Sequence, residues 1–291
     1  MGWHGSLVLR FRLDGARTIV HDRHEGPLRV LKSLHPEGPG ICHSVLVHPP
    51  GGIVGGDTLS LDLELAAGTH ALLSTPGATR FYRSLGEPAA QRLVVRAGPG
   101  ARLEWLPLET IAYSGCIAEN RSSFELAPGA EMIGWDVTAL GLGASGQPFV
   151  SGRFTQSIAL DTRWLERGTV RGDDTRLLRS PLGWAGRQVL ATLWFAAGSA
   201  IVEDRRDLLL EAAREAMARD RLADAQPPTP DRARDSDSLP AGASAVQPEV
   251  VVVRALADRV EPAMALLTRI WRAWRRAAWQ LEACAPRVWQ T

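Results

Sequence analysis

The chain of 291 residues carries a net charge of +1, with 33 basic and 32 acidic side chains, which gives no support for nucleic acid as its main partner. No apolar run approaches the ~20 residues that span a bilayer, and the first residues lack an apolar signal core. The three widely spaced cysteines, Cys42, Cys116 and Cys284, argue against a disulfide framework. We therefore expect a globular cytoplasmic protein without membrane contact.

Short apolar or alternating segments, separated by turn residues, predict β-strands from residue 6 to about residue 200. The clearest is LSLDLEL (59–65), whose four leucines fall on one face of a strand. Further strands are predicted at 7–13, 44–48, 70–75, 91–97, 101–106 and 121–126. The turn glycines Gly68, Gly100 and Gly129 recur at a spacing of about 30 residues, which predicts stacked strand layers. An ordinary sandwich of hairpins is the alternative.

Two helices are predicted near the C-terminal end. The segment DLLLEAAREAMARDRL after Asp204 has helical spacing and composition, which places a helix at about 205–222. The last helix is expected at about 261–283, with Pro262 in its first turn and Pro286 after its end. The expected fold class is therefore mainly β, with two α-helices near the C-terminal end.

The segment between these helices differs in composition from the rest of the chain. Residues 225–249 are rich in proline, serine and charge, which predicts a mobile loop. A strand is expected at 251–256. The resulting organisation is a single domain over 1–291, β-rich in 1–203 and 250–257.

The last helix has two distinct faces. Its apolar stripe consists of Met264, Leu267, Trp271, Trp274 and Leu281. Its basic band consists of Arg269, Arg272, Arg275 and Arg276. A solvated face is the simplest interpretation of this band. The alternative is a partner-binding surface formed by Arg269, Arg272, Arg276, Trp271 and Trp274.

The stretch HPPGGIVGGD (48–57) contains two glycine pairs, as phosphate-binding loops often do. A phosphate loop is excluded because no lysine follows, Asp57 would repel the anion, and the next element is a strand instead of a helix. The glycines are interpreted as turn residues, which leaves His48 and Asp57 available for another role.

The cysteine, histidine and acidic side chains of the chain suggest metal binding. No pair of them has the sequence spacing that is typical of a permanent metal site. Cys42 is more typical of a small buried apolar residue than of a ligand. Acidic residues on several layers can instead line a passage for a weakly held cation. Glu109 and Asp136 are the best candidates, because both lie in apolar neighbourhoods.

The chain lacks a motif for a catalytic nucleophile, since it contains no G-x-S-x-G sequence. Paired carboxylates for glycoside cleavage stay open as an alternative, because β-solenoids can carry them. The segment TPGATRFYRS (75–84) mixes aromatic and basic residues. We expect these side chains to pack within the protein, and this interpretation is favoured over stacking of the aromatic rings on RNA bases.

Several motifs, in this order and spacing, resemble the urease accessory protein UreD (UreH) family: HPPGGIVGGD, TPGATRFYRS, WLPLETIAYSG, GAEMIGWDVTALGLGASGQPF, LLRSPLGWAGRQVLATLWF and PRVWQT. The resemblance covers nearly the whole chain except 225–249. It implies a β-helix-like superhelix of stacked strands with two helices near the C-terminal end, which agrees with the repeat.

The resemblance also implies a maturation factor and not an enzyme. Members of this family bind the accessory protein UreF and, through it, the GTPase UreG, and dock this assembly on apo-urease. Nickel is expected to pass through a water-filled internal passage, as transient Ni²⁺ and not as a permanent cofactor. The matching motif positions are Asp57, Thr75, Arg80, Glu109 and Asp136, and the predicted route also includes His48 and Cys42.

The chain departs from the family pattern at two positions. Gln147 stands where an acid is usual, and Arg80 replaces a common lysine. Two other functions stay open: a pure adaptor without a metal role, and a β-solenoid enzyme acting on carbohydrate.

Overall fold

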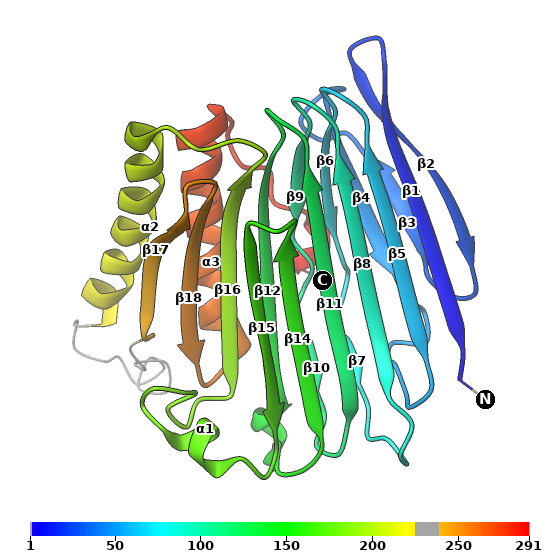
Figure 1. Cartoon of the computed structure of the whole chain (residues 1–291), viewed down its shortest axis with the longest axis vertical. Helices are drawn as coiled ribbons and strands as arrows, with labels where there is room; N and C mark the ends of the chain where they lie inside the picture. The colour runs from blue at the N-terminus through cyan, green and yellow to red at the C-terminus, as the bar shows by residue number, and fades with distance from the viewer. Residues whose placement is uncertain (1, 225–238, 291) are drawn as a thin grey trace.

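The computed structural model describes residues 2–224 and 239–290, and it consists mainly of two facing β-sheets (Figure 1). The smaller sheet contains, in spatial order, β15 (Trp164–Arg171), β14 (Arg153–Leu160), β11 (Ile117–Leu126), β8 (Ala89–Ala97), β5 (Thr58–Leu65), β1 (His4–Asp14) and β2 (Arg17–Glu25). The main path of the larger sheet contains β17 (Ala241–Gln247), β18 (Val250–Ala257), β16 (Val189–Ala197), β12 (Glu131–Leu142), β9 (Arg102–Trp105), β6 (His70–Ser74), β4 (Ile41–Val47) and β3 (Arg29–Leu34). Three short strands join it at the side: β7 (Thr79–Phe81), β10 (Thr110–Ala112) and β13 (Gln147–Pro148).

The centre of the molecule repeats one unit, as β5–β6–β7, β8–β9–β10 and β11–β12, and in the third copy the end of β12 takes the place of a separate third strand by pairing with β10 in parallel. Each unit passes from the smaller to the larger sheet through a glycine turn, and Gly68, Gly100 and Gly129 all have positive φ (71°, 68° and 79°). Successive units pair in parallel and in register. This stacking confirms the predicted β-helix-like fold, whereas the sandwich of hairpins is wrong.

Two apolar cores hold the layers together. The alternating leucines of β5 are buried between the two sheets, as the sequence pattern predicts. A second core lies between the outer face of the larger sheet and two helices, α2 (Glu203–Asp224) and α3 (Val260–Trp274). Shorter helical segments are α1 (Thr175–Arg179), η1 (Gly143–Ser145), η3 (Arg275–Trp279) and η4 (Arg287–Gln290). Among the described helices, none has both the length and the apolar character that crossing a membrane requires.

The prediction of a mobile loop over residues 225–249 is wrong for its second half. Residues 241–247 form β17, which pairs antiparallel with β18, while 225–238 lie outside the described residues. The strand AGASAVQ has low intrinsic β-propensity, so its pairing depends on the open edge that β18 offers.

The last helix ends earlier than its periodicity predicts. Helix α3 stops at Trp274, a π-helical turn follows at η3, and Gln280 adopts a left-handed conformation with φ of 55°. The wider turn directs Arg275 and Trp279 into the protein, where both are buried. The basic band predicted on this helix therefore loses Arg275.

Candidate functional site

The glycine-rich loop between β4 and β5 borders a cavity of about 180 Å³. Gly51 has a φ of 75°, and a Cβ at Gly52 would lie 2.1 Å from the ring of Tyr82, so both glycines are required by local geometry. His48, Thr75 and Arg80 line the cavity. The structure thus brings three of the predicted residues together.

Asp57 is the last residue of this loop, and its carboxylate accepts hydrogen bonds from the backbone. Its Oδ1 accepts the N–H of Trp3 (2.7 Å), and its Oδ2 accepts the N–H of Val54 (3.1 Å). One carboxylate oxygen therefore binds the loop itself and the other binds the N-terminal segment, which sequence patterns alone do not reveal.

We expect Asp57→Ala to lower the free energy of unfolding by about 1 kcal/mol, because two backbone N–H groups lose their acceptor in a partly solvated loop. The matched control Glu25→Ala removes an exposed carboxylate and should change stability by less than about 0.5 kcal/mol. Urea unfolding of both variants measures the difference. Equal stabilities would show that Asp57 does not hold the loop.

The remaining predicted residues near the cavity differ in accessibility. Cys42 is fully buried in the core, and burial raises the pKa of its thiol, which disfavours the thiolate that binds metals. Burial lowers the pKa of His48, against the attraction of Asp57, and so favours the neutral imidazole. Glu109 does not line the cavity, although its carbonyl accepts the N–H of Thr79 (2.9 Å).

A row of polar side chains crosses the apolar space between the sheets. On the smaller sheet, Gln91, Asn120 and Gln156 are register neighbours on adjacent parallel strands. On the larger sheet, Asp136, Thr192 and Arg254 are likewise neighbours in register. We call these six residues, with Glu166 and Thr138, the polar layer.

Hydrogen bonds connect the two halves of the polar layer. Gln91 Nε2 donates to Asn120 Oδ1 (3.3 Å), and Asn120 Nδ2 donates to Asp136 Oδ2 (3.4 Å). At the other end, Arg254 forms an ion pair with Glu166. Gln91 also lines the cavity at the glycine-rich loop, whereas Arg254 lines a surface depression near β17. The polar layer thus runs from the cavity at the glycine-rich loop to the depression near β17.

Asp136 is the central carboxylate of this layer. Burial raises its pKa to about 6, since the hydrogen bond from Thr138 and the nearby Gln156 amide offset only part of the desolvation and Glu166 adds repulsion. Neither amide atom of Gln156 completes a hydrogen bond with another described residue, although both are buried. The layer therefore contains an ionisable group and an incompletely satisfied amide within an apolar core.

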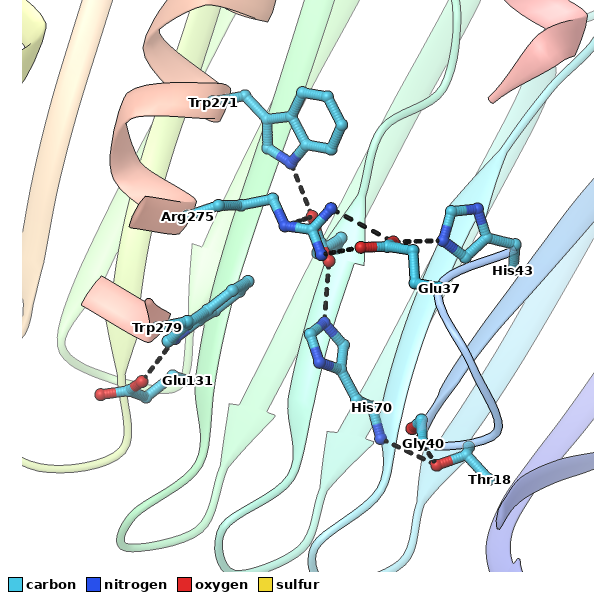
Figure 2. Close-up of polar contacts among 10 residues, drawn as sticks. Thr18, Glu37, Gly40, His43, His70, Glu131, Trp271, Arg275 and Trp279 are labelled. Carbon is cyan, nitrogen blue, oxygen red and sulfur yellow. Dashed lines mark hydrogen bonds and ion pairs between the residues drawn. The ribbon is translucent and has the colours of Figure 1, made fainter. Parts of the chain in front are cut away.

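Outside the larger sheet, a buried ion network surrounds Arg275 (Figure 2). The Arg275 guanidinium is fully buried, lies 2.6 Å from Glu37 Oε2 and 3.6 Å from Glu104 Oε2, and packs over the ring of Trp271. Trp271 Nε1 donates to Glu104 Oε2 (2.6 Å). One cation from η3 therefore holds two carboxylates from distant parts of the chain.

Two histidines complete this network. His43 Nε2 lies 2.7 Å from Glu37 Oε1, and His70 Nε2 lies 2.8 Å from Glu104 Oε1. Although burial opposes it, hydrogen bonds from His43 and Arg275 hold the pKa of Glu37 below its ordinary value. The network fastens the C-terminal segment to the loop between β3 and β4 and to the larger sheet.

The partner surface predicted on the last helix is only partly exposed. Trp271 and Trp274 are 0% exposed, and Trp274 donates to the carbonyl of Leu209 (2.8 Å), so their predicted role in a surface contact is wrong for this conformation. Arg272 and Arg276 are exposed, and Arg276 pairs with Glu282. Arg269 is partly exposed.

The motifs of the sequence do not predict the network around Arg275. A signal was available, since Arg275 follows Trp271 by four residues and so shares its helical face. Within residues 2–224 and 239–290, no three histidine, cysteine, aspartate or glutamate side chains come together as a metal site. Gln147 is exposed on the short strand β13.

Comparisons with known proteins agree with the resemblance. The family model described as UreD urease accessory protein matches residues 4–290. The chain is 55% identical to the urease accessory protein UreD of Leptothrix cholodnii over 100% of both chains, and 54% identical to that of Albidiferax ferrireducens over 99% of both. That of Variovorax paradoxus is 52% identical over 100% of both chains. These relatives are named as accessory proteins and not as enzymes, so the carbohydrate-active alternative is wrong. The chain belongs to the UreD urease accessory protein family.

Proposed function

We propose that this chain docks accessory proteins on apo-urease in the cytoplasm and conducts nickel to the urease active site through the polar layer. The partners are UreF, the GTPase UreG and apo-urease, as the family resemblance implies. The observation that carries the proposal is the row of polar side chains between the cavity and the depression near β17, set in an otherwise apolar core. Hydrogen bonds join its members from Gln91 to Asp136 and from Thr192 to Glu166, and strand register places Asp136 beside Thr192.

The ligand chemistry of this row suits passage better than storage. Carboxylate and amide oxygens bind divalent cations through exchangeable bonds, and Ni²⁺ can keep part of its water shell beside them. The unsatisfied amide of Gln156 offers an oxygen to a hydrated ion beside the carboxyl of Asp136. A thiolate would instead retain the metal, and burial raises the pKa of the Cys42 thiol and so disfavours that form.

The test is urease activation in cells that carry the cognate urease operon. Asp136→Asn and Gln156→Leu alter the polar layer, whereas the control Asp62→Asn alters a carboxylate that is paired with Arg10 and Arg96. We expect the first two variants to lower the nickel content of purified urease at least tenfold while UreF and apo-urease still co-purify. Normal nickel content in both would overturn the conduit.

The second candidate is a pure adaptor without a metal role. The geometry of Asp57 favours it, because this predicted route residue holds backbone N–H groups and so serves the fold. Under this alternative, layer variants that keep their complexes would also keep full urease activation.

A further inference from the structure

One edge of the smaller sheet exposes large apolar side chains on neighbouring loops. This edge lies where β1, β5, β8, β11 and β14 begin, at the bottom of Figure 1. The exposed side chains are Trp3 (65%), Val54 (47%), Leu85 (103%) and Val150 (63%). We call these four residues the loop-edge surface. Large apolar side chains that gather on a rigid face mark interaction sites more often than isolated ones.

Backbone hydrogen bonds join these loops into one surface. Asp57 accepts N–H groups from Trp3 and Val54, which fixes the first two members together. The other loop-to-loop bonds run from Gly56 N to Pro88 O (2.9 Å), from Ser84 N to Gly115 O (3.0 Å) and from Gly115 N to Ser151 O (2.8 Å). A surface held in this way loses little conformational entropy when a partner binds.

The charge beside the loop-edge surface indicates the chemistry of its partner. Arg83 is exposed, and its aliphatic part lies close to Gly115, where an added Cβ would be 2.9 Å from Arg83 Cγ. Neither Arg80 nor Arg83 forms a side-chain hydrogen bond or ion pair with another residue in the described part of the chain. Glu87 is exposed on the same loop as Leu85, but it forms no ion pair with either guanidinium. Two guanidinium groups that have no carboxylate partner among the described residues, beside exposed apolar groups, fit a segment that carries both acidic and apolar side chains.

The position of the loop-edge surface links it to the cavity. Ile53 N donates to Arg80 O (2.7 Å), and Tyr82 N donates to Ile53 O (3.0 Å), so the loop that carries Val54 is bonded to the strand that lines the cavity. A partner segment on this surface therefore lies next to the cavity at which the polar layer begins.

We propose that the loop-edge surface binds an acidic, apolar segment of a partner protein in urease maturation. The inference rests on the proposed function for the identity of that partner, but it concerns docking and not nickel transfer. Trp3 and Leu85 supply the apolar contacts, and Arg80 and Arg83 pair with carboxylates of the bound segment.

The test measures binding of the full-length chain to purified UreF and, separately, to purified apo-urease, in the absence of nickel. The variants are Leu85→Glu and Arg83→Glu, and the matched control is Leu208→Glu, which changes an exposed leucine of α2. We expect both loop-edge variants to weaken binding of the same partner at least tenfold, because one segment contacts both Leu85 and Arg83. The control should bind both partners as the unchanged chain does, and thermal unfolding establishes that all variants are folded.

Two outcomes would overturn the proposal. In the first, both loop-edge variants bind UreF and apo-urease with unchanged affinity. In the second, sedimentation of the chain alone shows a dimer that Leu85→Glu dissociates, which assigns the surface to a second copy. Because the Asp136→Asn experiment reads nickel transfer in intact complexes, failure of docking and failure of the conduit are distinguishable.

Discussion

Replacing Arg275 with methionine is expected to lower the free energy of unfolding by about 3 to 5 kcal/mol. The substitution leaves Glu37 and Glu104 buried beside each other without their shared cation. Methionine fills a similar length of the site, so the lost stability reflects the loss of the guanidinium charge beside two buried carboxylates more than a cavity. Urea unfolding at pH 7 measures the effect.

The neighbouring residue supplies the control for this prediction. Arg276 is exposed and pairs with Glu282 at the surface, so Arg276→Met should cost less than about 1 kcal/mol. Adding Glu37→Gln to Arg275→Met should restore part of the stability, because one buried charge is removed. If the double variant is no more stable than Arg275→Met, uncompensated charge is not the cause of the loss.

The second large effect concerns Asp136, and its size depends on pH. Because the pKa of Asp136 is raised to about 6 in the folded chain, the folded state binds this proton more tightly than the unfolded state. The contribution of Asp136 to stability therefore falls as the pH rises from about 4 to about 6, and it stays at its lower level above that. Asp136→Asn should raise the free energy of unfolding at pH 7 by about 2 to 3 kcal/mol.

Urea unfolding of the unchanged chain and of the Asp136→Asn variant between pH 4 and pH 8 measures this effect. The two stability curves should converge towards pH 4 and separate up to about pH 6. A variant that gains stability while urease loses nickel would show that the carboxylate is kept at a cost to the fold. Parallel curves over the whole range would show that Asp136 is not the titrating group.

The repeat is the part of the fold that the sequence predicts best. Alternating leucines in β5 and glycines at a spacing of about 30 residues are local signals, and each needs only its own neighbours to be interpreted. The strand β17 carries no such signal, because its small residues pair only where β18 presents an open edge.

Candidate site residues divide in the same way. The sequence by itself determined the stacked strands, the two helices, the turn role of the glycine-rich loop and the presence of Asp136 in an apolar strand. Only the tertiary structure decided that Asp57 binds backbone N–H groups, that Gln91, Asn120 and Asp136 form one polar layer, and that Arg275 turns inward. The physical reason is that periodicity assigns a residue to a face of its own element, whereas its partners come from other elements, 29 residues away for Gln91 and Asn120 and 238 away for Arg275 and Glu37.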